Sequence, residues 1–162
     1  MMKTNLKTVV STFAVILLMS GCDGFLDVNK NPNNPTDVPE NLQLPGIQGV
    51  FSYEILAGRG TRATSQWIQQ TAWNGVHPSY DSYDLRPNDA NPVWTNSYPQ
   101  VMNNAWNMVE KAEQNENNDY AAIGRILIAW NMGIITDLYG PAPYSEAWQG
   151  ADNPTPDYDT QE

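Results

Sequence analysis

The run from Asp119 to Tyr139 constrains the fold of this chain more than any other segment. Apolar side chains recur in it at intervals of three and four residues, which is the spacing of one face of an α-helix. This stripe consists of Ile123, Ile126, Leu127, Trp130, Ile134 and Leu138, with Ile128, Met132 and Ile135 beside it. Asp119 is placed to cap the helix, and Gly140 followed by Pro141 ends it. A helix that is apolar on more than one face expects neighbours on both sides.

Three further stretches have a similar periodicity. Helices are predicted over Asn41–Ala57, over Thr61–Trp73, and from about Asn91 or Trp94 to Glu113. Pro45 fits the first turn of a helix that begins near Leu42 to Leu44. The small residues Ala121, Ala122, Gly124 and Ala129 would let a neighbouring helix approach closely. Helix pairs with small residues at their contacts are what a helical-repeat protein would show, although the spacing is too irregular to establish a repeat.

The first 22 residues have the layout of a secretory signal. Lys3 and Lys7 precede a mostly apolar run from Val9 to Met19, and Ser20-Gly21-Cys22 follows. A cysteine directly after two small residues is typical of a bacterial lipoprotein. In such a protein the Cys22 thiol takes a diacylglycerol, the chain is cut before Cys22, and the freed amine is usually acylated too. The apolar run is barely more than half of the about 20 residues that a membrane-spanning helix needs. A chance cysteine behind an ordinary signal stays open as the alternative.

Charge excludes two classes of partner. The eighteen acidic residues all lie at or beyond Asp23, whereas the loss of Lys3 and Lys7 would leave six basic residues in the mature part. The resulting net charge of minus twelve argues against nucleic acid, whose phosphates demand a basic surface. It also argues against binding to anionic lipid through a polybasic patch.

The residues predict no catalytic centre and no metal or cofactor site. His77 is the single histidine, Cys22 is the single cysteine, and no Gly-x-Ser-x-Gly sequence is present. Asp81, Asp84 and Asp89 suggest calcium, but the segment has neither the glycine nor the closing glutamate of an EF-hand loop. Paired carboxylates for glycoside hydrolysis stay open, because acidic residues are many and nothing marks one pair out.

Aromatic residues are plentiful, with six tryptophans and eight tyrosines. A pyranose ring can stack its C–H face on an aromatic plane, while amides and carboxylates bind its hydroxyl groups. Rings among Asn, Asp and Gln are therefore what a sugar-binding surface uses. Burial of the same rings in a core is the alternative interpretation.

Several stretches of the chain resemble the SusD/RagB-like outer-membrane lipoproteins. They are Cys22–Asn29 with Asn31-Pro32-Asn33 behind it, Asn41–Pro45, Ile126–Gly140, Pro141–Ala147 and Thr155–Glu162. Ile126–Ala147 is the most specific of them, because it is similar to that family's signature helix and the D-x-(W/Y)-G-x-(V/A)-P-Y-(S/T)-E-A turn behind it. Residues 58–100 match only loosely.

The resemblance implies an all-α fold of tetratricopeptide-like helix pairs with long irregular loops. It also implies a place on the outer face of the outer membrane. The implied partner is a TonB-dependent transporter of the SusC-like type, and the implied ligand is a glycan or, in some members, a peptide. Such proteins bind and deliver rather than catalyse; a glycoside-active enzyme of the same uptake system, or a purely structural scaffold, is the alternative. On this basis residues 1–21 are a signal peptide, 22–40 an irregular lead-in, and 41–162 the N-terminal helical region of a larger SusD-like fold.

Ligand residues of that family lie largely on loops over the helical scaffold, which directs attention to residues 73–94. This loop alternates rings with acids, and an arginine in it can bind hydroxyls or a carboxylate through two parallel hydrogen bonds. Its candidate ligand-binding residues are Trp73, His77, Tyr80, Tyr83, Asp84, Arg86 and Trp94. An ordinary exposed loop remains the alternative. Asp137, Tyr139, Gly140, Pro141, Pro143 and Tyr144 are interpreted as structural.

Overall fold

The computed structural model describes residues 37–77 and 79–161. The predicted signal peptide, Cys22 and most of the lead-in 22–40 therefore lie outside the described residues. The chain divides after Asp37, and every helix described below belongs to the unit Val38–Glu162.

Helices make up most of this unit. Helix α2 (Glu40–Val50) continues into the π-helix η1 (Phe51–Leu56), and α3 (Arg59–Trp67) follows. After the short 3₁₀-helix η2 (Ser79–Ser82), three segments succeed one another without a break: α4 (Pro87–Asn96), the π-helix η3 (Ser97–Met102) and α5 (Asn103–Gln114). Then come α6 (Asn118–Tyr139) and the 3₁₀-helix η4 (Gly150–Asp152). Within the described residues, the β structure is a single isolated bridge between Ala142 and Asp159, so the predicted all-α class is confirmed.

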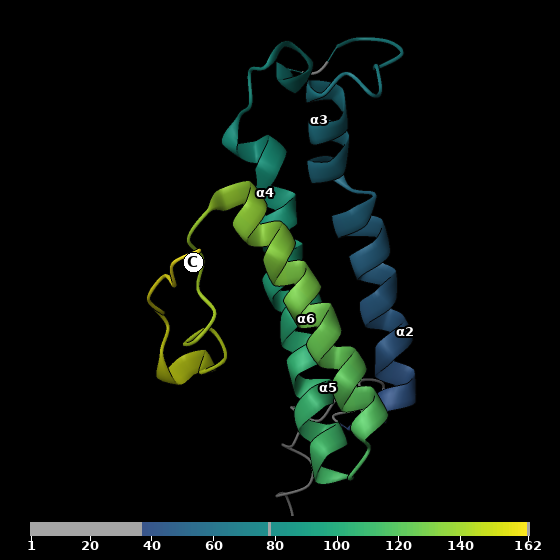
Figure 1. Cartoon of the computed structure of the whole chain (residues 1–162), viewed down its shortest axis with the longest axis vertical. Helices are drawn as coiled ribbons and strands as arrows, with labels where there is room; N and C mark the ends of the chain where they lie inside the picture. The colour runs from purple at the N-terminus through teal and green to yellow at the C-terminus, as the bar shows by residue number, and fades with distance from the viewer. Residues whose placement is uncertain (1–36, 78, 162) are drawn as a thin grey trace, which may run out of the picture. The chain divides into compact units, whose positions relative to one another are not determined.

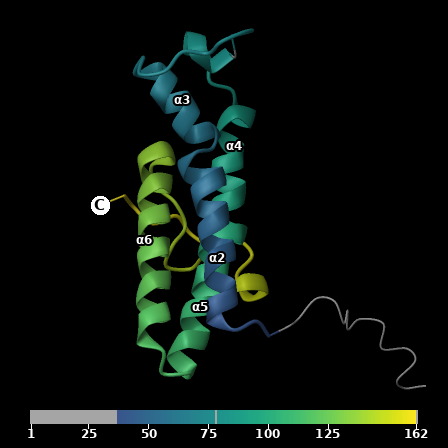
Figure 2. The same cartoon turned by 90° about the vertical axis from the view of Figure 1, so that its right-hand side faces the viewer.

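Helices α2, α5 and α6 lie side by side, as two perpendicular views show (Figures 1 and 2). Helix α6 returns along α5 after the short connector around Asn115–Asn117. The core between them is built from side chains of all three helices and of η1 and η3. Its members with the least exposure include Ile47, Phe51, Ile55, Val101, Ala105, Met108, Ala112, Ala121, Ile128 and Ile135.

The face that α6 buries differs from the predicted stripe. Ala121, Gly124, Leu127, Ile128, Asn131 and Ile135 are buried, whereas Ile126 is 63% and Trp130 55% exposed. Helix α5 approaches most closely at Gly124, where no side chain fits, because a Cβ built there would lie 2.5 Å from Val109 Cγ2. Among the described residues, α6 is the helix long and apolar enough to span a membrane, a property that core helices of soluble proteins share.

One predicted helix end and one predicted helix start were wrong. Helix α3 ends at Trp67 rather than Trp73, because Gln69 adopts a positive φ of 59° and the next amide, that of Gln70, donates back to the Ser65 carbonyl. Helix α4 begins earlier than predicted, with Pro87 in its first turn. There the Asp89 carboxylate accepts a hydrogen bond from the Arg86 amide at 3.1 Å.

Two predicted helix starts were also wrong in detail. Helix α2 begins at Glu40, so that Pro45 lies inside it and not in its first turn. The carbonyl of Pro39 accepts hydrogen bonds from the amides of Leu42 and Gln43, which closes the first turn upstream of the predicted start. Asp119 lies within the first turn of α6, and the residue at the cap position is Asn117.

Candidate functional site

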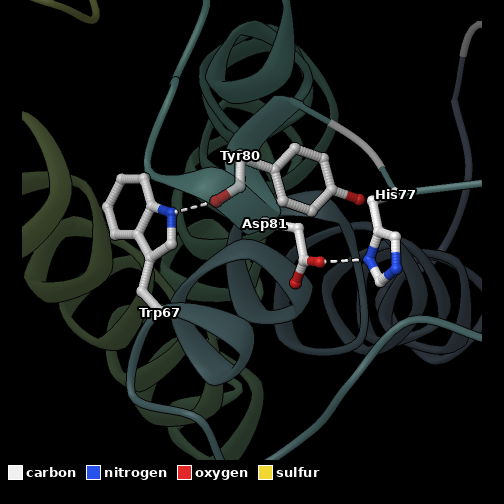
Figure 3. A network of polar contacts seen from close by, with 4 residues as sticks. All are labelled: Trp67, His77, Tyr80 and Asp81. Carbon is white, nitrogen blue, oxygen red and sulfur yellow. Dashed lines mark hydrogen bonds and ion pairs between the residues drawn. The ribbon is translucent and has the colours of Figure 1, made fainter.

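The loop after α3 is held by a small polar network (Figure 3). Trp67 Nε1 donates a hydrogen bond to the Tyr80 carbonyl at 2.6 Å. His77 Nδ1 pairs with the Asp81 carboxylate, one helical turn away. On the exposed side, the Tyr83 hydroxyl donates to the Trp67 carbonyl at 3.0 Å. These contacts fix η2 over the end of α3.

The predicted ligand residues of this loop divide by exposure. Trp73, His77, Tyr83, Asp84 and Arg86 are exposed. Arg86 and Asp84 form an ion pair with an N–O distance of 3.5 Å, and both side chains are about two-thirds exposed. Tyr80 differs from them, because it is buried with only 8% of its surface exposed.

Trp94 was predicted in the loop but lies on α4. Its indole ring is half-buried and packs against three tyrosines from different parts of the chain. The ring centroids lie 4.9 Å from Tyr98, 5.3 Å from Tyr139 and 6.4 Å from Tyr158. The rings of Trp94 and Tyr158 are close to parallel, with 20° between their planes. The structure therefore separates Trp94 from the loop residues with which the sequence grouped it.

A groove of about 420 Å³ lies over these rings. We call it the aromatic groove. It is lined by Trp94, Tyr98, Pro143, Ala147, Thr155, Pro156 and Tyr158. One wall comes from the continuous helix α4–η3, and the other comes from the segment that follows α6, the yellow-green to yellow chain in Figure 1.

The segment after α6 has no regular structure over most of its length, yet many hydrogen bonds hold it. Gly140 ends α6 with a φ of +80°, which glycine adopts without strain. The Tyr98 hydroxyl then donates to the Pro143 carbonyl at 2.8 Å, and the Glu146 carboxylate accepts from Asn153 Nδ2 at 2.9 Å and from the Asp157 amide at 3.2 Å. These contacts place Pro143, Pro156 and Tyr158 along the groove.

Burial and nearby negative charge shape the titration of Tyr98. Desolvation, followed by Tyr158 and Asp159, raises the pKa of Tyr98 to about 12. Its phenol is therefore neutral at physiological pH and remains a hydrogen-bond donor to the segment it holds. Burial similarly raises the pKa of Tyr139, whose ring lies nearly perpendicular to that of Trp94.

A comparison with protein families decides the family of this chain. The SusD-like family model, described as starch-binding associating with outer membrane, matches residues 33–162. The chain belongs to the SusD-like family. This is a family of binding proteins associated with the outer membrane. No curated protein and no solved structure matches the chain.

The matched region of this SusD-like chain contains both the loop after α3 and the aromatic groove. Among the described residues, no group of three His, Cys, Asp or Glu side chains is placed to hold a metal ion. The groove offers flat apolar ring faces together with the hydroxyl groups of Tyr98, Thr155 and Tyr158. Such a surface suits stacking and hydrogen bonding rather than proton transfer by carboxylates.

Sequence reasoning missed Tyr98 and Tyr158 as groove residues. Tyr98 lies four residues after Trp94, the spacing at which two side chains share a helix face, so the helical pattern contained this signal. No comparable signal connects Tyr158 to Trp94, since their contact depends on the irregular segment after α6.

Proposed function

We propose that this SusD-like protein is a surface lipoprotein that binds a glycan in the aromatic groove and delivers it to a TonB-dependent transporter. The observation that supports this proposal most is the aromatic groove, with Trp94, Tyr98 and Tyr158 along its wall. Its volume of about 420 Å³ falls within the roughly 300–1,000 Å³ of ordinary ligand sites. Rings of this kind present large apolar faces with a polar edge, which matches a sugar ring.

The exposed residues of the loop after α3 form a second set of proposed contacts. Trp73 and Tyr83 offer ring faces, and the Asp84–Arg86 pair offers groups for hydroxyls. In this proposal His77 contributes at the loop edge, while Tyr80 acts through its carbonyl, which fixes Trp67. Trp94 is the one predicted ligand residue that also lines the aromatic groove.

Binding is favoured over glycoside hydrolysis by the lining of the groove. Hydrolysis of a glycosidic bond generally needs two carboxyl groups on opposite sides of the scissile bond. None of the seven residues that line the aromatic groove is Asp or Glu. The enzyme alternative would therefore require carboxylates from elsewhere.

A glycan array tests binding and catalysis together. The protein is applied to immobilised oligosaccharides, including starch-derived maltooligosaccharides, and the same oligosaccharides are then incubated with it in solution and analysed for shortened products. The proposal expects retention on at least one glycan class without product. Retention with product would favour the enzyme, and no retention on any glycan would contradict the proposed function.

The membrane anchor is proposed at Cys22, on the lipoprotein layout of the first 22 residues. Cys22→Ala should leave the protein unprocessed or release it from the membrane fraction, because the acyl chains would be the attachment. Ser20→Ala is a matched control, since alanine is also small and leaves the cysteine in place. Membrane retention and processing of Cys22→Ala equal to those of the unmodified protein would contradict the anchor.

Delivery to a transporter has a separate test. The protein is expressed in its own cells with an affinity tag, solubilised in mild detergent and isolated. The proposal expects a TonB-dependent β-barrel to co-purify in near-equal amount. Its absence after chemical cross-linking in intact cells would contradict this part of the proposal while leaving glycan binding untouched.

A further inference from the structure

We propose that Asp159 is the positioning residue of the aromatic groove: by holding the turn at Tyr144 and Ser145, it sets Tyr158 opposite Trp94. The inference rests on the proposed function, because it assigns a residue that controls the same site without lining it. Asp159 is not among the seven lining residues, and nothing in the sequence pattern distinguished it.

The carboxylate of Asp159 collects three donors from one turn. Oδ2 accepts the amide of Tyr144 at 2.7 Å and the amide of Ser145 at 2.9 Å. Oδ1 accepts the Ser145 hydroxyl. Hydrogen bonds to an ionised acceptor are about twice as strong as neutral ones. One partly exposed side chain therefore holds the start of the segment after α6 against its end.

The backbone of Asp159 makes the same connection. Its amide donates to the Ala142 carbonyl at 3.2 Å, and its carbonyl accepts from the Ala142 amide at 3.3 Å. This pair is the isolated antiparallel bridge of the unit, and Ala142 is only 1% exposed. Because Tyr158 immediately precedes Asp159, the bridge and the carboxylate together determine where the Tyr158 ring lies.

The chain around Tyr158 has a second anchor upstream. The Glu146 carboxylate holds Asn153 and the Asp157 amide, which fixes the part of the segment that carries Thr155 and Pro156. Tyr158 itself is 63% exposed, so its own burial contributes little to its placement. Loss of the Asp159 carboxylate should therefore loosen Tyr158 while the Glu146 contacts keep the upstream part in place.

The pH dependence of the turn distinguishes a role of the Asp159 charge from a role in packing alone. The hydroxyl of Ser145 and then the amides of Ser145 and Tyr144 hold the pKa of Asp159 below its ordinary value of 3.8. A depressed carboxyl pKa gives stability that is present above the unfolded value and is lost as pH falls through the folded value. The turn should therefore be released over a pH range that begins near 3.8 and extends to lower pH.

Other titratable groups face the same region. They include the phenols of Tyr98, from η3, and of Tyr158. Glu146 is a further carboxylate on the same segment, and it accepts the Asp157 amide. A variant that removes only the Asp159 charge is therefore needed to assign the effect.

Three variants of the whole protein test the inference. Asp159→Ala removes every acceptor of the turn. Asp159→Asn keeps an acceptor oxygen and a group that can bond the Ser145 hydroxyl, but has no charge to titrate. Asp152→Asn is the control, since it removes one exposed negative charge from the same segment, in η4, outside the groove lining.

Two readouts are measured for each variant. Hydrogen exchange, without any ligand, measures the exchange rates of the Tyr144 and Ser145 amides. Titration with maltoheptaose measures the affinity of the aromatic groove for a glycan. Asp159→Ala should speed exchange of both amides at least tenfold and weaken maltoheptaose binding at least tenfold, whereas Asp152→Asn should change neither. Asp159→Asn should retain much of the protection, and it should flatten the loss of protection that we expect for the unmodified protein below a pH of about 4.

Unchanged exchange in Asp159→Ala would overturn the inference, as would fast exchange with undiminished binding. If Asp159→Ala fails to fold, the acid profile of Asp159→Asn decides, because an unaltered profile would also overturn the inference. If the unmodified protein does not bind maltoheptaose, that result counts against the proposed function for this glycan. The exchange measurements then test the positioning of the turn separately.

Discussion

The Ser97 hydroxyl donates a hydrogen bond to Asn131 Oδ1 at 3.1 Å, and both residues are fully buried. Asn131 Nδ2 also donates to the Ser97 carbonyl at 3.4 Å. This contact joins the first residue of η3 to the middle of α6, the most apolar helix of the described chain. Buried polar groups must find partners, so the pair sets the position of α6 against η3 in a way that apolar side chains alone would not.

Asn131→Leu should destabilise the protein by about 2 kcal/mol, because it leaves the buried Ser97 hydroxyl without its acceptor. The free energy of unfolding is measured by urea denaturation followed by circular dichroism. Asn103→Leu, at an exposed position at the start of α5, is the control and should change stability by no more than about 0.5 kcal/mol. Equal stability of Asn131→Leu and the unmodified protein would show that the pair does not contribute.

Gly124 and Gly133 make a matched pair on α6. A Cβ at Gly124 would lie 2.5 Å from Val109 Cγ2 and 3.3 Å from the Ala105 carbonyl, whereas nothing lies within 4 Å of a Cβ at Gly133. Gly124→Ala should therefore destabilise the fold by about 1 kcal/mol or more, since overpacking outweighs the gain in helix propensity. Gly133→Ala should stabilise it by up to about 1 kcal/mol. Thermal unfolding of both variants gives the two signs, and two changes of the same sign would contradict the α5–α6 contact.

Alkaline pH should loosen the segment after α6. The pKa of Tyr98 is raised from 10.0 to about 12, which means that the folded state favours the neutral phenol. The corresponding stability is present in full below pH 10 and is lost as pH rises towards 12. Tyr98→Phe should lower stability by about 1 kcal/mol at neutral pH, through the lost hydrogen bond to Pro143.

Urea denaturation in the alkaline range tests the second half of this prediction. The difference in unfolding free energy between the unmodified protein and Tyr98→Phe should shrink as pH rises above 10. Tyr53→Phe is the control. Because Tyr53 is 75% exposed, this variant should leave the pH dependence of the unfolding free energy unchanged. A difference that stays constant with pH would contradict the role of Tyr98 as a donor.

The sequence predicted the helices better than the surfaces they bury. The apolar period and the Gly140-Pro141 stop placed α6 within one residue of its observed start and at its observed end. The same period did not identify the buried face, because Gly124 and Ala121 lie inward while Trp130 lies outward. Hydrophobicity alone favours the larger side chains, whereas the close approach of α5 selects the smaller ones.

The candidate site was predicted only in part. Trp94 was identified among the aromatic residues, but it was grouped with the loop 73–94, because the helix was expected to begin only at about Asn91 or Trp94. Proline in the first turn instead helps to start α4. The partner ring at Tyr158 lies on a segment whose path depends on side-chain contacts of Asp159 and Tyr98, and local sequence pattern does not encode such a path.

The loop after α3 gives an independent prediction. Trp73→Ala combined with Tyr83→Ala should weaken glycan binding about tenfold or more, if each lost ring contact costs on the order of 1 kcal/mol. Tyr83 also donates to the Trp67 carbonyl, so Tyr83→Phe is a needed comparison that keeps the ring and removes the hydroxyl. Unchanged affinity of the double variant, with an unchanged helical signal, would remove the loop from the site.

The most direct test of the aromatic groove is titration calorimetry of Tyr158→Ala with the best glycan from the array. Tyr158 is 63% exposed, and its ring centroid lies 6.4 Å from that of Trp94. Removal of this ring should weaken glycan binding about tenfold, or about 1.4 kcal/mol, without changing the helical signal. Tyr53→Ala, which removes a similarly exposed ring on η1 outside the groove, should bind as the unmodified protein does. Equal affinities for Tyr158→Ala and Tyr53→Ala would contradict the assignment of the groove as the glycan site.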